Sequence, residues 1–108
     1  MNTNTNSFEN DVLRSEMPVL VDFFATWCGP CRMMSPVLDQ VAKSYEGRGK
    51  VLKVDSDEAP ELAERFGITA VPTLILFHRG QPVQKATGMQ STRQLSALFD
   101  SVASPVVA

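Results

Sequence analysis

Two cysteines, three residues apart, are the residues of this chain best suited to chemistry. They stand in the segment Trp27-Cys28-Gly29-Pro30-Cys31, directly after a strongly apolar stretch. Residues three apart on a helix face the same side, with Cβ atoms about 5–6 Å apart. A modest approach brings such a pair to the roughly 3.5–4.5 Å that a disulfide requires. The spacing therefore predicts a dithiol that cycles between two thiols and a disulfide.

Three other uses of a cysteine pair fit the sequence less well. A zinc knuckle usually combines two such pairs, or one pair with spaced histidines, and His78 is the only histidine. A c-type haem attachment needs a histidine directly after the second cysteine, where Arg32 stands. Structural disulfides of small secreted domains normally occur in multiples and with a signal peptide, and the polar segment 1–6 lacks signal character. Redox chemistry is favoured.

The bulk composition is that of an ordinary globular protein. The chain has 108 residues, 44% of them hydrophobic and 20% charged, which predicts one domain over residues 1–108 with a polar start at 1–6 and a frayed tail at 104–108. A net charge of −2 gives no general attraction to nucleic acid or anionic membranes. The apolar run 19–25 is far shorter than a membrane span. We expect a reducing, cytoplasmic location, or the plastid stroma if a transit peptide has been removed.

Apolar periodicity and turn residues predict a layered α/β domain with a mixed sheet. Segment 19–24 is apolar on both faces apart from Asp22, which is typical of a strand buried in a parallel sheet. The predicted elements, in order, are a helix capped by Ser7, this strand, a long helix from the cysteine motif to Gly47, a strand at 50–55, a short helix capped by Asp57, a hairpin of strands at 73–77 and 83–87 around a turn at 78–81, and a helix opened by a Ser91–Gln94 capping box.

The motif Trp-Cys-Gly-Pro-Cys and this order of elements resemble the thioredoxin family over residues 7–102. The resemblance implies an α/β thioredoxin fold, a central mixed sheet of four to five strands flanked by four helices. The family begins with an extra apolar edge strand, where this chain has the polar segment 2–6. Either that strand is very short here, or the sheet has four strands at most.

The resemblance also implies an activity. The chain would be a thiol-disulfide oxidoreductase, that is, a general protein-disulfide reductase and electron carrier in cell redox homeostasis. It would use a reversible Cys28–Cys31 disulfide and no bound cofactor. Its partners would be disulfide-containing target proteins and an NADPH- or ferredoxin-dependent thioredoxin reductase, and the chain would act as a monomer.

The two cysteines are expected to differ in role. Cys28 lies where the helix begins, so its sulfur should face unpaired backbone N–H groups, which lower the pKa of a thiol. Pro30 occupies an early helical position, where its missing N–H costs little. Cys31 lies one turn inside the helix and should be more buried. This reasoning and the resemblance make Cys28 the nucleophile and Cys31 the thiol that resolves the mixed disulfide.

Asp22 is the candidate base that removes the proton of Cys31. An isolated buried charge is costly, so burial should raise the pKa of this carboxyl towards neutrality. The alternative is that Asp22 faces solvent or caps a turn. Lys53, in the next predicted strand, matches a family lysine that lies near this aspartate, and a solvated lysine at a strand edge is the alternative.

The expected substrate surface combines the redox motif with two later segments. Trp27 would be a docking surface rather than a core residue, with Gly29 and Pro30 beside it. In the family, the proline that matches Pro72 is cis and packs against the dithiol, although the sequence alone leaves the isomer open. Such a turn would leave the Val71 backbone free to pair with an extended substrate. Gly88 matches a glycine that admits substrate backbone, or is a simple turn glycine.

Two competing functions remain. Oxidases and isomerases of this family tend to carry histidine as the third motif residue, where this chain has Pro30, so the motif favours a reductant. A binding module that acts by docking, without redox turnover, is the alternative from another class.

Overall fold

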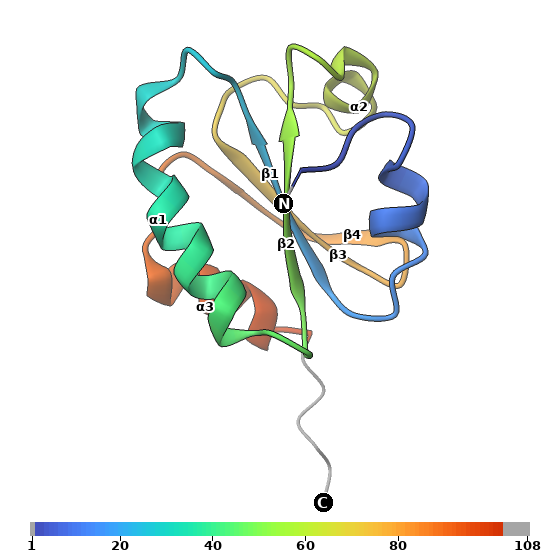
Figure 1. The fold of residues 1–108 in the computed structure, drawn as a ribbon, viewed down its shortest axis with the longest axis vertical. Helices are drawn as coiled ribbons and strands as arrows, with labels where there is room; N and C mark the ends of the chain where they lie inside the picture. Colours follow the sequence, from blue (N-terminus) through green and yellow to red (C-terminus); the bar gives the residue numbers. More distant parts are fainter. Residues whose placement is uncertain (1, 103–108) are drawn as a thin grey trace, which may run out of the picture.

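The computed structural model describes residues 2–102, which fold into a four-stranded sheet covered on both faces (Figure 1). The elements are a short π-helical segment η1 (Glu9–Leu13), β1 (Val19–Phe24), α1 (Gly29–Ser44), β2 (Lys50–Asp55), α2 (Pro60–Arg65), β3 (Thr73–His78), β4 (Gln81–Thr87) and α3 (Thr92–Asp100). The strands lie in the order β2-β1-β3-β4; β1 pairs with β2 in parallel and with β3 antiparallel, and β3 and β4 are antiparallel. The predicted thioredoxin fold is confirmed.

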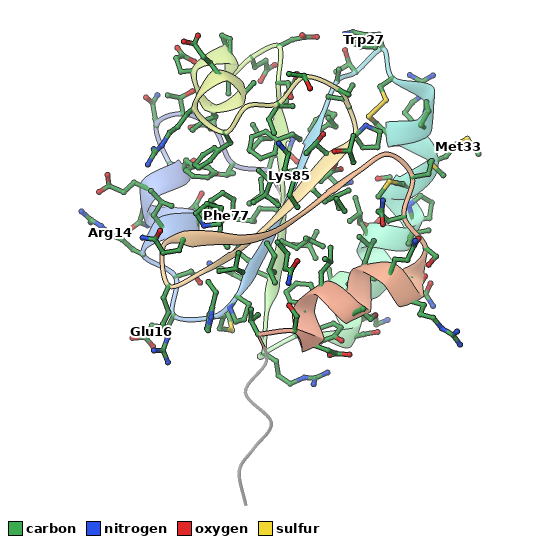
Figure 2. All side chains as sticks on the ribbon, turned by 180° about the vertical axis from the view of Figure 1, so that it is seen from behind. Arg14, Glu16, Trp27, Met33, Phe77 and Lys85 are labelled. Atoms are coloured by element: carbon green, nitrogen blue, oxygen red, sulfur yellow. A yellow bond between two sulfur atoms is a disulfide. The ribbon has the colours of Figure 1, made fainter. Side chains whose placement is uncertain are left out.

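Strand β1 is the centre of the core, as its sequence, apolar on both faces apart from Asp22, predicts. Val19, Leu20, Val21 and Phe23 are all 0% exposed, and burial of each side chain contributes about 1.5–3 kcal/mol. Alternate side chains point to opposite faces of the sheet. One face packs against η1 and α2, and the other packs against α1 and α3 (Figures 1 and 2). β1 can therefore hold a side chain rigidly under α1.

The N-terminal segment makes one bridge to the sheet instead of a fifth strand. Asn2 pairs in parallel with Lys53, and the Thr3 N–H donates to the Lys53 carbonyl at 2.8 Å. The chain then turns away at Asn4, whose side-chain oxygen accepts from the backbone N–H groups of Asn6 and Ser7. Of the two alternatives that the polar start allowed, the sheet of four strands is found.

Two predicted helix caps are wrong, and a third is confirmed. Ser7 caps no helix, because the preceding turn begins at Asn4 and the Ser7 hydroxyl accepts from the Asn4 N–H at 3.2 Å. α2 begins two residues later than an Asp57 cap requires, with Ala59 at the N-cap position. At α3 the capping box of Ser91 and Gln94 is present in both directions.

The β3–β4 hairpin closes with a two-residue loop, tighter than the predicted turn at 78–81. Arg79 and Gly80 both have positive φ, 53° and 80°, which is the conformation of a type I′ hairpin turn. His78 and Gln81 therefore pair as the last and first residues of the two strands. The predicted frayed tail at 104–108 lies outside the described residues.

Candidate active site

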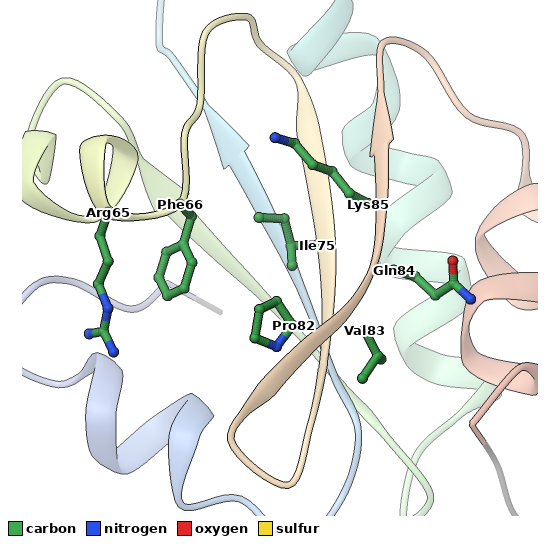
Figure 3. A pocket seen from close by; sticks show the side chains of 7 residues that line it. All are labelled: Arg65, Phe66, Ile75, Pro82, Val83, Gln84 and Lys85. Atoms are coloured by element: carbon green, nitrogen blue, oxygen red, sulfur yellow. The ribbon is translucent and has the colours of Figure 1, made fainter.

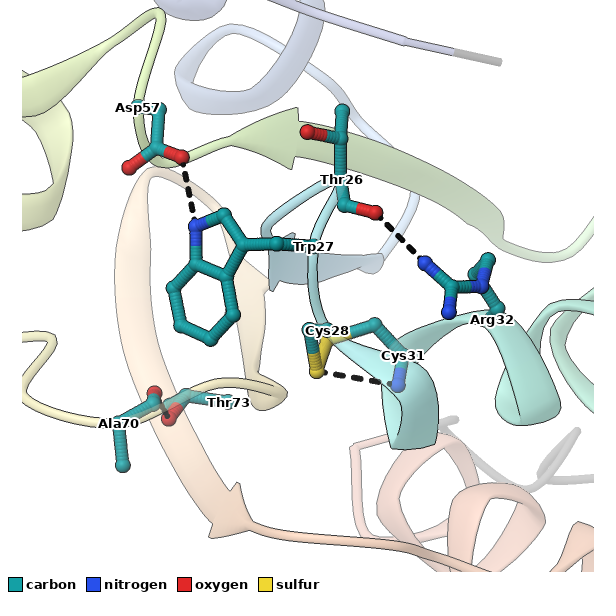
Figure 4. The surroundings of a disulfide bond; sticks show 8 residues. All are labelled: Thr26, Trp27, Cys28, Cys31, Arg32, Asp57, Ala70 and Thr73. Atoms are coloured by element: carbon teal, nitrogen blue, oxygen red, sulfur yellow. Dashed lines mark hydrogen bonds between the residues drawn. A yellow bond between two sulfur atoms is a disulfide. The ribbon is translucent and has the colours of Figure 1, made fainter.

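The two cysteines lie at the junction of β1 and α1 and are joined in a disulfide with a Cα–Cα distance of 5.3 Å (Figure 4). Cys28 is the N-cap of α1 in extended conformation, and its sulfur accepts from the Cys31 N–H at 3.2 Å. The predicted position of Cys28 before the unpaired N–H groups of a helix start is confirmed. Pro30 lies in the first turn, where a missing N–H leaves no hydrogen bond unmade.

The two cysteines are equally buried. Cys28 is 4% exposed and Cys31 is 5% exposed, so the prediction that Cys31 is the more buried residue is wrong. The physical reason is that both pack in one small apolar cluster with Ala25, and Val71 and Phe24 pack against that cluster. Any difference in reactivity must therefore come from the position of each sulfur on α1 rather than from residue burial.

Asp22 is buried under α1 on the central strand, with 1% of its surface exposed. The alternative of a solvent-facing carboxylate is therefore wrong. Its Oδ1 atom has no hydrogen-bond partner among residues 2–102, and burial raises the pKa of Asp22 to about 6, against a smaller lowering effect of Lys53. A carboxyl that titrates near neutrality can exchange protons with a thiol.

Asp22 and Cys31 open onto the same cavity. It has a volume of about 500 Å³, and its lining also includes Lys53, Arg32 and Ser35. Lys53 stands opposite Asp22 in the β1–β2 register, as the resemblance implies. Its ammonium group, however, donates to the Ser35 hydroxyl at 2.6 Å. The cavity gives the carboxyl a route to solvent and places it on the Cys31 side of the disulfide.

Sequence reasoning missed two residues of this cavity. Ser35 follows Cys31 by four positions, so helical periodicity was the available signal. The Arg32 guanidinium donates to the Thr26 carbonyl at 2.8 Å across the start of α1 (Figure 4). This contact joins the first turn of α1 to the loop that precedes the cysteines. No local sequence pattern indicates it.

The Val71–Pro72 segment packs beside the disulfide. The Val71–Pro72 peptide bond is cis, as the resemblance implies, and Val71 contacts the cluster that contains both cysteines. The Pro72 carbonyl accepts from the Gly88 N–H at 2.8 Å, and Gly88 has φ of 90°, a conformation that favours glycine. The residues that precede β3 and follow β4 are thus hydrogen-bonded to each other at the edge of the site.

Trp27 is 69% exposed beside the disulfide, so a core role for this residue is wrong. Its indole N–H donates to the Asp57 carboxylate at 2.9 Å, which fixes one edge of the ring and leaves the face open (Figure 4). The carboxylate expected to cap α2 is used in this contact instead. Figure 2 shows Trp27 projecting from the molecule, whereas Phe77 lies inside it.

Cys28 and Cys31 are the two cysteines of the chain, so the remaining surface of residues 2–102 carries no second cysteine pair. A cavity of about 430 Å³ opens against β4, between Arg65, Phe66 and Lys85, on the far side of the sheet from α1 (Figure 3). Within residues 2–102 no three His, Cys, Asp or Glu side chains gather as they would around a metal ion. None of the helices in that part of the chain is long and apolar enough to cross a membrane.

Comparison with known proteins places this sequence in a family. The family model described as Thioredoxin matches residues 1–101. The chain belongs to the thioredoxin family. It is 54% identical over 94 residues to thioredoxin of Synechocystis sp. and 50% identical over 94 residues to thioredoxin 1 of Nostoc sp., covering 87% of this chain and 88% of each relative. It is 45% identical over 101 residues to thioredoxin of Pseudomonas aeruginosa, covering 94% of both chains.

Membership of the thioredoxin family fixes the type of activity. The chain is a thiol-disulfide oxidoreductase, and the Cys28–Cys31 pair is its redox-active disulfide. Disulfide-containing proteins and a thioredoxin reductase are the general partners of the thioredoxin family, and the family normally needs no cofactor. The sequence prediction of a redox function is confirmed.

Proposed function

We propose that this chain, a single domain over residues 1–108, is a general reductant of protein disulfides in which Cys28 attacks and Cys31 resolves. The observation that carries the proposal is the asymmetric placement of the pair at the start of α1, with Asp22 buried on the Cys31 side. In the first step, the Cys28 thiolate attacks one sulfur of the target disulfide. The other target sulfur leaves as a thiolate, and a mixed disulfide remains.

The second step uses Asp22 as the base. The Asp22 carboxylate takes the proton of Cys31, directly or through a water in the shared cavity. The Cys31 thiolate then attacks the Cys28 sulfur, and the second target sulfur leaves as a thiolate. The target gains two electrons and the Cys28–Cys31 disulfide forms. Lys53 is assigned a supporting role, as a positive charge near this base.

The substrate would dock on the rim around the disulfide. The exposed face of Trp27 supports an apolar contact with the target. The Val71 backbone is proposed to pair with an extended target segment, as in strand addition, while Pro72 and Gly88 hold that edge. Gly29 has open space at its Cβ position, which supports close approach of target backbone beside Cys28.

The finer properties of the cycle follow from the same proposal. A thioredoxin reductase, NADPH- or ferredoxin-dependent, would return two electrons to the disulfide. The chain would act as a monomer in the cytoplasm, or in a plastid stroma, without a bound cofactor and without nucleic acid or membrane partners. The net charge of −2 supports the last point.

The test is disulfide reduction of insulin, with dithiothreitol as electron source, by the wild type and by Cys31→Ser. The wild type should turn over, and Cys31→Ser should turn over far more slowly, because only dithiothreitol can release its mixed disulfide. Asp22→Asn should slow release of the mixed disulfide more than its formation. Equal slowing of both steps would reject Asp22 as the base, and equal turnover by Cys31→Ser would reject the exchange mechanism.

A reduction potential distinguishes this reductase from an oxidase. Pro30, in place of the histidine typical of oxidases, supports a reducing pair. Equilibration of the dithiol against glutathione buffers measures the potential. A value well above the cytosolic glutathione poise would contradict the proposal. If Cys31→Ser supports the same partner process in cells as the wild type, docking rather than turnover is the function.

A further inference from the structure

The Lys53 ammonium group lies closer to an uncharged hydroxyl than to the carboxylate that stands opposite it. Lys53 and Asp22 are partners in the β1–β2 register, so their side chains project from the same face of the sheet. Yet Lys53 Nζ donates to Ser35 Oγ at 2.6 Å, and no ion pair joins Lys53 to Asp22 in the described chain. Among residues 2–102, the buried Asp22 Oδ1 atom meanwhile has no hydrogen-bond partner.

The location of Ser35 explains how it can hold the lysine. Ser35 is half-buried on α1, one helical turn after Cys31, and its side chain lines the cavity that Asp22 and Lys53 share. An alanine at this position would have no acceptor for an ammonium group. The long, flexible lysine side chain would then be free to approach the carboxylate, since the opposite charges of the two groups attract each other.

The other charged groups around Asp22 already have partners elsewhere. On α1, Arg32 is directed to the Thr26 carbonyl. On β2, the Asp55 side chain accepts from the Asp57 N–H at 2.9 Å, and on β3 the register partner of Asp22 is the apolar Leu74. The N-terminal segment contributes only the neutral Asn2 to the cavity. Among residues 2–102, Lys53 is the charged side chain whose Coulomb interaction lowers the pKa of Asp22, so its position matters most for this carboxyl.

We propose that Ser35 is a positioning residue that holds the Lys53 ammonium group away from Asp22 and so preserves the carboxyl as a proton acceptor for Cys31. The pKa of Asp22, raised to about 6 chiefly by burial, is consistent with a lysine that compensates only part of the burial cost. The device matters to the reaction only through the proposed role of Asp22 as base, on which it rests.

Ser35→Ala should therefore lower the pKa of Asp22. An ammonium group that reaches ion-pair distance favours the charged carboxylate, and such a contact lowers a carboxyl pKa by about 1–3 units. We expect a fall of about one unit in the variant, because the cavity keeps water near the pair. The pH at which release of the mixed disulfide is half-maximal should fall by the same amount.

The experiment is a ¹³C NMR titration of the Asp22 carboxyl in the oxidised protein, which needs no catalytic turnover. Wild type, Ser35→Ala and Ser35→Thr are compared, with Asp39→Asn, an exposed change one turn further along α1, as the control. Ser35→Thr keeps a hydroxyl and should keep the pKa of Asp22 close to that of the wild type. Alanine is the best helix former, so Ser35→Ala should fold.

A double-mutant cycle with Lys53→Met identifies the lysine as the mediator. In the Lys53→Met background, Ser35→Ala should leave the pKa of Asp22 unchanged. An unchanged or raised pKa of Asp22 in Ser35→Ala alone, or an equal fall in both backgrounds, would overturn the proposal. This titration uses the resting disulfide form and tests only the positioning role of Ser35. The role of Asp22 as base is tested separately, by the kinetics of Asp22→Asn.

Discussion

The buried carboxyl of Asp22 should make the protein less stable at neutral pH than an asparagine variant would be. The pKa of Asp22 rises from 3.8 in the unfolded chain to about 6 in the fold, mainly through burial. A difference of about 2 pKa units corresponds to about 3 kcal/mol between the two protonation states. Below the unfolded pKa, the carboxyl is protonated in both states and costs nothing. As pH rises above the unfolded pKa, the unfolding free energy falls, because the unfolded chain ionises more easily than the fold. The loss is complete once the pH lies above the folded pKa.

Asp22→Asn replaces the carboxyl by a neutral group of the same shape. The unfolding free energy of the variant minus that of the wild type should rise by roughly 2.5 kcal/mol between pH 4 and pH 8. Urea unfolding of both oxidised proteins across this range measures the difference, and any constant cost of burying the amide cancels. The corresponding change in relative Tm is roughly 10–20 °C for a domain of this size.

The control is Asp39→Asn, which removes one carboxyl at an exposed position on α1. Its stability relative to the wild type should vary far less with pH, since an exposed carboxyl is hydrated in both states. If the Asp22→Asn difference stays constant from pH 4 to pH 8, Asp22 is not desolvated. The argument for a base tuned by burial would then be refuted.

Two further predictions concern the packing between α1, β2 and α3. Gly49→Ala should lower the unfolding free energy by about 1–3 kcal/mol, because its Cβ would lie 2.6 Å from the buried Phe99 ring. Urea unfolding tests this, with Gly29→Ala, whose Cβ has no neighbour within 4 Å, as the control, and equal stabilities would contradict it. Tyr45, the only tyrosine, should titrate spectrophotometrically with a pKa above 10.0, because burial and, after it, the hydrogen bond to Asp100 disfavour the phenolate. A pKa at or below that value would contradict this account of its surroundings.

The strands and the long helices of this fold could be predicted from the sequence because each has a strong local pattern. The apolar run of β1 gave its bounds directly, and β2 also has the predicted bounds, 50–55. The helix starts at Ser7 and Asp57 were wrong because polar side chains have several possible partners. Asn4 takes over the first turn, and Asp57 binds Trp27, thirty positions away in the chain.

The redox pair could be recognised from type and spacing alone, but its surroundings could not. The burial of Asp22 was predictable because a carboxyl interrupts an apolar strand. The partner of Lys53 was not, since the Ser35 contact joins residues eighteen positions apart on different elements. Equal burial of Cys28 and Cys31 also depends on Val71, which the chain brings to the disulfide only through the fold.

The central claim, that Cys28 attacks and Cys31 resolves, is tested most directly by trapping. Cys31→Ser and Cys28→Ser are each reduced, mixed with a peptide disulfide at neutral pH, and analysed by intact-protein mass spectrometry. Cys31→Ser should accumulate rapidly and stoichiometrically as a mixed disulfide through Cys28, while Cys28→Ser should react far more slowly. Faster trapping on Cys31 in the Cys28→Ser protein, or equal rates for both variants, would contradict the account.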